Sequence, residues 1–107
     1  MAEKSRRRAM LEQSLADDPS DAFLRYGLAV QCLREGDIAE GRDRLRALIA
    51  DHPDDQVAAY QQLGQSYLET GELEEASATL RAGIDRARAR GDWHALAEME
   101  GLLAQLG

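Results

Sequence analysis

The feature that most constrains the fold is an internal repeat with a period near 34 residues. The tripeptide GDI at 36–38 aligns with GEL at 71–73, at an offset of 35. Asp-Pro at 18–19 and His-Pro at 52–53 are 34 apart, and each precedes an acidic stretch. A sequence that repeats at this distance is typical of stacked supersecondary units, each of which buries its apolar face against its neighbours.

Each unit contains two segments with helical periodicity. Apolar residues stand at 24, 28 and 32 and at 60, 63, 64 and 67 in the first segments, and at 38, 45, 48 and 49 and at 73, 76, 80 and 84 in the second. Gly36 and Gly71 separate the segments, because glycine readily adopts the positive φ that ends a helix. Ala, Leu, Glu, Arg and Gln dominate the composition and only two prolines occur, which favours helix over strand. We expect an all-α fold built from antiparallel helix pairs.

The second unit matches a known repeat pattern. It carries an aromatic residue, Leu-Gly, Tyr, Ala and a large apolar residue at Tyr60, Leu63-Gly64, Tyr67, Ala76 and Leu80. This spacing is similar to that of the tetratricopeptide repeat (TPR). The first unit is a weaker copy, with Leu-Ala at 28–29, Cys32 for Tyr, Gly41 for Ala and Leu45 at the large apolar position. The motif positions of the two units are Leu28, Ala29, Pro53, Tyr60, Leu63, Gly64, Tyr67, Ala76 and Leu80.

The resemblance implies one domain of about six helices, stacked as a short right-handed α-solenoid. We expect an N-terminal capping helix at 3–17, repeat 1 at 20–53, repeat 2 at 54–90 and a C-terminal capping helix at 92–106. Leu11 and Leu15 should face inward on the N-terminal helix. The C-terminal helix should start after Gly91 and Asp92 and carry Trp93, Leu96, Met99, Leu103 and Leu106.

The motif residues have structural explanations that need no chemistry. Gly64 removes a side chain where the two helices of a unit approach closely, and Ala76 does the same from the opposite helix. Tyr60, Tyr67 and Leu80 then fill the surrounding space with large side chains that have few rotamers to immobilise. We therefore predict a structural role for these residues.

No combination of residues predicts catalysis, a metal or a cofactor. His52 and His94 lack partners at metal-ligand spacing. We expect His52 to lie at a helix end and His94 to face solvent. Cys32 falls at a core position without a visible base, which favours an inert thiol. The acidic pairs at 54–55 and 74–75 stand at helix starts, where the helix dipole explains them. We expect a protein that is not an enzyme.

Charge and cysteine content limit the partners and the compartment. The net charge of −7 argues against nucleic acid and anionic membranes, which require concentrated positive charge. The basic run at 4–8 is interpreted as a solvated helix face rather than a binding patch. A single cysteine suits a reducing compartment, and neither a signal peptide nor a membrane span is expected. The expected location is the cytoplasm.

In TPR proteins the first helix of each pair lines a concave surface that commonly takes a peptide or partner helix. Carried over to this sequence, the resemblance places a second apolar stripe there in the first unit, beside the core stripe. The concave positions are Phe23, Tyr26, Val30, Leu33 and Arg34 in the first unit and Ala58, Gln61, Gln65, Leu68 and Glu69 in the second.

Three explanations for the apolar stripe stay open: the C-terminal helix covers it, a partner protein binds it, or it closes a homodimer. The Lys, Arg and Asn residues with which some TPR proteins grip a C-terminal carboxylate are not matched here, so that mode is not expected. The sequence predicts a non-catalytic protein–protein interaction module that binds a peptide or partner helix. The alternative is a structural subunit whose repeats mainly drive homo-oligomerisation.

Overall fold

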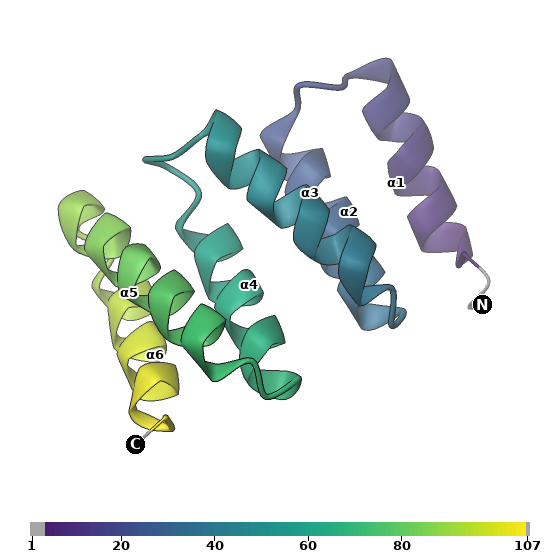
Figure 1. Cartoon of the computed structure of the whole chain (residues 1–107). Helices are drawn as coiled ribbons and strands as arrows, with labels where there is room; N and C mark the ends of the chain where they lie inside the picture. Colours follow the sequence, from purple (N-terminus) through teal and green to yellow (C-terminus); the bar gives the residue numbers. More distant parts are fainter. Residues whose placement is uncertain (1–3, 107) are drawn as a thin grey trace. The chain divides into compact units, whose positions relative to one another are not determined.

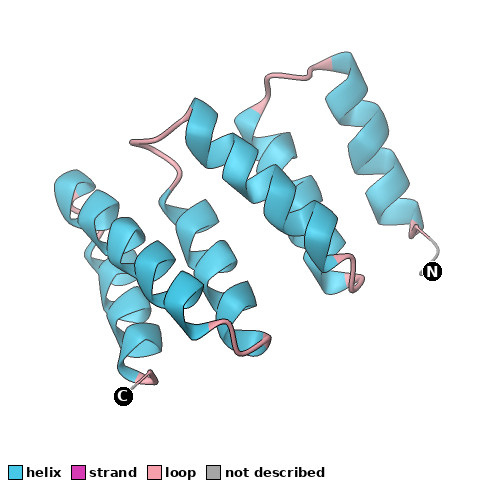
Figure 2. Ribbon diagram, viewed as in Figure 1, coloured by secondary structure: helices cyan, strands magenta, loops and turns pink. Residues whose placement is uncertain are grey.

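The computed structural model describes residues 4–106 and contains six α-helices and no strand in that range (Figure 2). The helices are α1 (Arg6–Asp17), α2 (Ala22–Arg34), α3 (Ile38–Asp51), α4 (Val57–Glu69), α5 (Leu73–Arg90) and α6 (Trp93–Ala104), labelled in Figure 1. Ala22 and Val57, which begin α2 and α4, are 35 residues apart, as are the first residues of α3 and α5. The all-α class and the helix pairing are therefore as predicted.

Glycine ends three of the helices by the expected mechanism. Gly36, Gly71 and Gly91 have φ values of 84°, 75° and 69°. After each of them the next backbone N–H donates to a carbonyl five residues back, as from Asp92 to Ala87 at 2.8 Å. This is the Schellman arrangement, which satisfies carbonyls that the helix end would leave unpaired.

The described chain forms two compact units that divide between Leu48 and Ile49. The N-terminal unit contains α1, α2 and most of α3, and the C-terminal unit contains α4, α5 and α6. The N-terminal helix begins at Arg6, whereas position 3 of its expected span lies outside the described residues.

In the N-terminal unit, a small residue brings α2 and α3 together. A Cβ at Gly41 of α3 would lie 2.6 Å from Cδ2 of Leu33 and 3.1 Å from the carbonyl oxygen of Ala29, both on α2. Real Cβ atoms do not approach other carbon atoms this closely, so only glycine fits here without a shift. Leu28, Ala29 and Cys32 on α2 and Leu45 and Leu48 on α3 are buried.

In the C-terminal unit, glycines lie at two helix contacts. A Cβ at Gly64 of α4 would lie 2.6 Å from Cδ2 of Leu80 on α5. Another at Gly83 of α5 would lie 2.7 Å from both Sδ of Met99 on α6 and Cβ of Tyr60 on α4. The side chain that lies directly above Gly64 is that of Leu80, which was expected to fill the space around this glycine.

The core of the C-terminal unit includes residues from all three of its helices. Its buried cluster consists of Val57, Leu80, Ile84, Ala87 and Met99. Partly buried apolar residues from α4 and α6 pack against this cluster, so α6 covers the pair formed by α4 and α5.

Two apolar residues counted in the helical patterns lie outside the cores. Trp93 is 62% exposed and Leu73 is 52% exposed. Each is the first residue of its helix. Because side chains of a helix lean toward its N-terminus, a first residue reaches beyond the packed turns.

Candidate functional surfaces

The N-terminal unit exposes an apolar stripe on α2 that includes the predicted concave residues. Phe23 is 82% exposed, Tyr26 and Val30 are half-buried, and Arg34 is exposed. Their spacing of three or four residues puts them on one side of the helix. Phe23 stands out because most large apolar side chains of a folded domain are at least partly covered.

Leu33, the remaining apolar member of this stripe, is positioned differently. Its side chain lies above Gly41 of α3 and is half-buried. It therefore contributes to the contact between α2 and α3, and only part of its surface is accessible from outside. The accessible part of the stripe centres on Phe23 and Val30.

The corresponding face of α4 in the C-terminal unit is mainly polar. Gln65 and Glu69 are exposed and Gln61 is half-buried, as is Leu68, which packs against the core of the unit. Ala58 is exposed. This face offers amide groups for hydrogen bonds and little apolar area.

Arg8 departs most clearly from the sequence interpretation. It belongs to the basic run that was expected to be solvated, yet it is only 2% exposed. Its Nη2 lies 3.0 Å from Oδ2 of Asp37 and 2.9 Å from Oε1 of Glu40, and its Nη1 lies 3.7 Å from Oε1 of Glu35. The expectation was wrong for Arg8, because a guanidinium can be buried when several carboxylates compensate for lost hydration.

This ion cluster fastens α1 to the turn between α2 and α3. Ser5, the N-cap of α1, accepts a hydrogen bond from the backbone N–H of Arg8 at 3.0 Å and donates from its hydroxyl to Glu35. Glu35 also accepts from the amide of Gln31 at 2.7 Å. One end of α1 is therefore held by charge-assisted hydrogen bonds as well as by apolar contact.

Hydrogen bonds and ion pairs shift the pKa values of three members of this cluster. The hydrogen bond to Asp37, helped by Glu40, raises the pKa of Arg8. The hydroxyl of Ser5 and then the amide of Gln31 lower the pKa of Glu35. Arg44, at 2.8 Å, and then Arg8 lower the pKa of Glu40.

Sequence reasoning missed this cluster, although a signal was present. Arg8, Leu11 and Leu15 follow the i, i+3, i+7 spacing of one helix face. Leu11 and Leu15 were expected to face inward, and both are half-buried. Arg8 should have been placed on the same face.

The thiol of Cys32 is fully buried, as its core position predicted. Its Sγ lies 3.6 Å from Oε2 of Glu40. Burial, and then the nearby Glu40 carboxylate, raise the pKa of this thiol. Because the thiolate is the nucleophilic form, this environment disfavours reaction at Cys32.

The two histidines lie apart from any cluster of metal ligands. His52 directly follows the last residue of α3, and the side chain of His94 is 88% exposed and lies 3.2 Å from Glu98. Within residues 4–106, no group of three or more His, Cys, Asp or Glu side chains is arranged to hold a metal ion.

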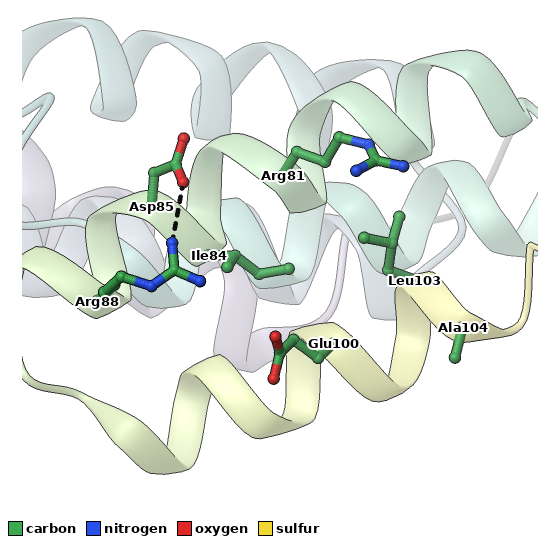
Figure 3. A pocket seen from close by; sticks show the side chains of 7 residues that line it. All are labelled: Arg81, Ile84, Asp85, Arg88, Glu100, Leu103 and Ala104. Atoms are coloured by element: carbon green, nitrogen blue, oxygen red, sulfur yellow. Dashed lines mark hydrogen bonds and ion pairs between the residues drawn. The ribbon is translucent and has the colours of Figure 1, made fainter.

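A surface groove of about 540 Å³ lies between α5 and α6 in the C-terminal unit. Figure 3 shows Arg88 paired with Asp85 at 3.3 Å along one wall. Glu100 projects from α6 on the other side, and Ile84 and Leu103 lie between the helices. Nε of Arg81 donates to the hydroxyl of Ser77 at 3.1 Å, and the residues that line this groove include no nucleophile beside a base.

Comparison with known proteins identifies the repeat. The sequence model of the tetratricopeptide repeat matches residues 8–63 and, in a second and overlapping match, residues 33–106. The chain belongs to the tetratricopeptide-repeat family. TPR domains typically bind protein partners, and the family is generally a non-catalytic scaffold.

Solved TPR structures agree with this assignment. A TPR domain protein from Salinibacter ruber, solved in solution, is 29% identical with a TM-score of 0.77, and the match covers 83% of this chain and 89% of that one. Its crystal structure matches at 28% identity and a TM-score of 0.74, covering 80% and 96%. A protein from Bordetella parapertussis shares the fold, with a TM-score of 0.82 at 23% identity, covering 97% and 89%. No curated protein matches the TPR chain significantly.

None of the helices in residues 4–106 is long and apolar enough to cross a lipid bilayer.

Proposed function

We propose that this TPR chain is a non-catalytic adaptor that binds a peptide or helix of a partner protein through the first helices of its repeats. The observation that carries the proposal is the exposure of Phe23, at 82%, on the same side of α2 as Tyr26 and Val30. Exposed apolar patches on soluble proteins commonly mark interaction surfaces. An aromatic anchor of this kind also contributes strongly to affinity once a partner covers it.

The neighbouring residues suggest the chemistry of the partner. Arg34 is exposed on the same side of α2 and would favour an acidic group beside the apolar anchor. Separately, in the C-terminal unit, the amides of Gln61 and Gln65 on α4 would supply hydrogen bonds to a peptide backbone on that unit's own surface. The partner we propose is therefore an amphipathic segment with apolar residues at helical spacing.

The overall charge and the single cysteine support two further parts of the proposal. A net charge of −7 favours a protein partner over nucleic acid. One free, buried cysteine suits a reducing compartment such as the cytoplasm.

The test compares a tagged wild-type chain with Phe23→Ser and Val30→Asp in affinity purification from the native cell. Because Phe23 is largely exposed, its replacement should leave the melting curve unchanged while specific partner bands are lost. Gln13→Ser, an exposed change on α1, is the matched control and should retain them. Recovery of the same partners with all variants would refute the proposed surface.

Light scattering over a concentration series separates partner binding from self-association through the same stripe. The adaptor proposal predicts that Phe23→Ser leaves the oligomeric state unchanged. A wild-type dimer that Val30→Asp converts to monomers would instead favour a structural subunit that associates with itself.

A further inference from the structure

The α1 helix carries an apolar groove that the functions discussed above do not use. It is lined by Arg6, Arg7, Met10, Leu11 and Ser14. Met10 is 62% exposed. Arg6 and Arg7 are exposed and have no ion-pair partner among residues 4–106, in contrast to Arg8. The groove therefore combines an exposed apolar floor with two exposed positive charges.

The outer face of α6 has the opposite properties. Ala97, Gly101 and Ala104 are exposed at i, i+4 and i+7, which places them along one side of the helix. Nothing lies within 4 Å of a Cβ built at Gly101. At about 100° per residue, Glu98 and Glu100 fall on either side of this strip, and both are exposed. Oε1 of Glu98 lies 3.2 Å from His94. Glu100 also lines the groove between α5 and α6, together with Arg81 and Arg88.

We propose that the α1 groove of one copy binds the outer face of α6 of a second copy. Met10 would project toward the open strip at Gly101. Arg6 and Arg7 would lie opposite Glu98 and Glu100. The positively charged groove of α1, with its large Met10 side chain, would then contact the strip of small residues on α6 and the carboxylates that flank it. The two faces differ, which makes the contact head-to-tail rather than self-complementary.

The chemistry of the contact determines how the association should behave. Exposed ion pairs contribute little individually and are screened by salt. The apolar contact is also narrow, because it involves one face of each helix. We therefore expect weak, concentration-dependent association that decreases as the ionic strength rises. This contact goes beyond the proposed function, which concerns α2 and α4.

Sedimentation velocity of the full chain at low salt, over a wide concentration range, tests the proposal through charge exchange. Arg6→Glu with Arg7→Glu, and separately Glu98→Arg with Glu100→Arg, should each weaken self-association by about tenfold or more. Arg6 and Arg7 stand in the first turn of α1, where the helix dipole favours glutamate, and Glu98 and Glu100 are exposed, so neither exchange should unfold the chain. An equimolar mixture of the two double variants should associate again, because each mutant face meets an opposite charge on the other variant.

A second pair of variants tests the contact without changing charge. Gly101→Leu has open space within the chain and should fold, but its side chain would fill the strip and abolish association. Ala89→Leu, at an exposed position of α5, is the control and should associate as wild type does. A wild-type chain that stays monomeric throughout, or charge variants whose mixture does not recover association, would overturn the proposal. Loss of association in Phe23→Ser would overturn it too, by assigning the contact to α2.

Discussion

The same substitution, glycine to alanine, should have opposite effects on stability at two positions of this chain. At Gly64, a Cβ would lie 2.6 Å from Cδ2 and 2.7 Å from Cγ of Leu80, which is fully buried. At Gly101, nothing lies within 4 Å of the new atom. Both positions are inside helices, so helix propensity is the same in the two cases and only the packing differs.

The magnitudes follow from two terms. Replacing glycine by alanine inside a helix stabilises it by about 1 kcal/mol. Overpacking a filled core costs about 1–3 kcal/mol, and Leu80 cannot move away because Cγ as well as Cδ2 is in contact. We expect Gly64→Ala to lower the free energy of unfolding by about 1 kcal/mol and Gly101→Ala to raise it by about 0.5–1 kcal/mol.

Urea denaturation followed by circular dichroism measures both changes, at a protein concentration low enough to keep the chain monomeric. The two midpoints should move in opposite directions from wild type. A 1 kcal/mol change should also shift the melting temperature by roughly 4 °C for a domain of this size. Equal stability of Gly64→Ala and Gly101→Ala would contradict the close contact between Gly64 of α4 and Leu80 of α5.

Three further predictions concern the ion cluster and the buried thiol. Arg8→Met should lower the free energy of unfolding by about 1–3 kcal/mol, because it leaves the carboxylates of the cluster facing one another; hydrogen exchange should then increase first in α1. Because the pKa values of Glu35 and Glu40 are lowered from 4.5, their contribution is complete above pH 4.5 and is lost as the pH falls below it. Denaturation midpoints measured as the pH falls should show this loss, and Arg8→Met should reduce it. Cys32 should react with a thiol reagent only at the rate at which the chain unfolds, and rapid labelling of the native protein would contradict its burial.

Much of the fold could be predicted because the repeat period, the glycine helix ends and the apolar spacing all indicate the same arrangement. Gly36 and Gly71 were placed correctly because positive φ is a local property that the residue type reveals. The role of Gly83 was not predicted. Its contacts with Tyr60 and Met99 join three helices, and no local pattern distinguishes it from an ordinary helical glycine.

The surfaces were harder to predict than the core. Arg8 was missed because a run of basic residues was treated as uniform, although Arg8 follows the spacing of Leu11 and Leu15 and its guanidinium reaches the carboxylates of Asp37 and Glu40. The stripe on α2 was predicted from its spacing. Spacing alone could not show that Leu33 packs against Gly41 of α3 whereas Phe23 is exposed to solvent. Exposure depends on which neighbours are present, and that information lies in the tertiary structure.

Site-specific photo-crosslinking in living cells tests the adaptor function most directly. A photoreactive phenylalanine analogue placed at Phe23 should give discrete covalent adducts with a partner protein, and Val30→Asp in the same chain should remove them. The analogue at Ala47, an exposed position of α3, should give none. Equal adducts from both positions, or adducts at Phe23 that consist only of a second copy of this chain, would contradict partner binding through α2.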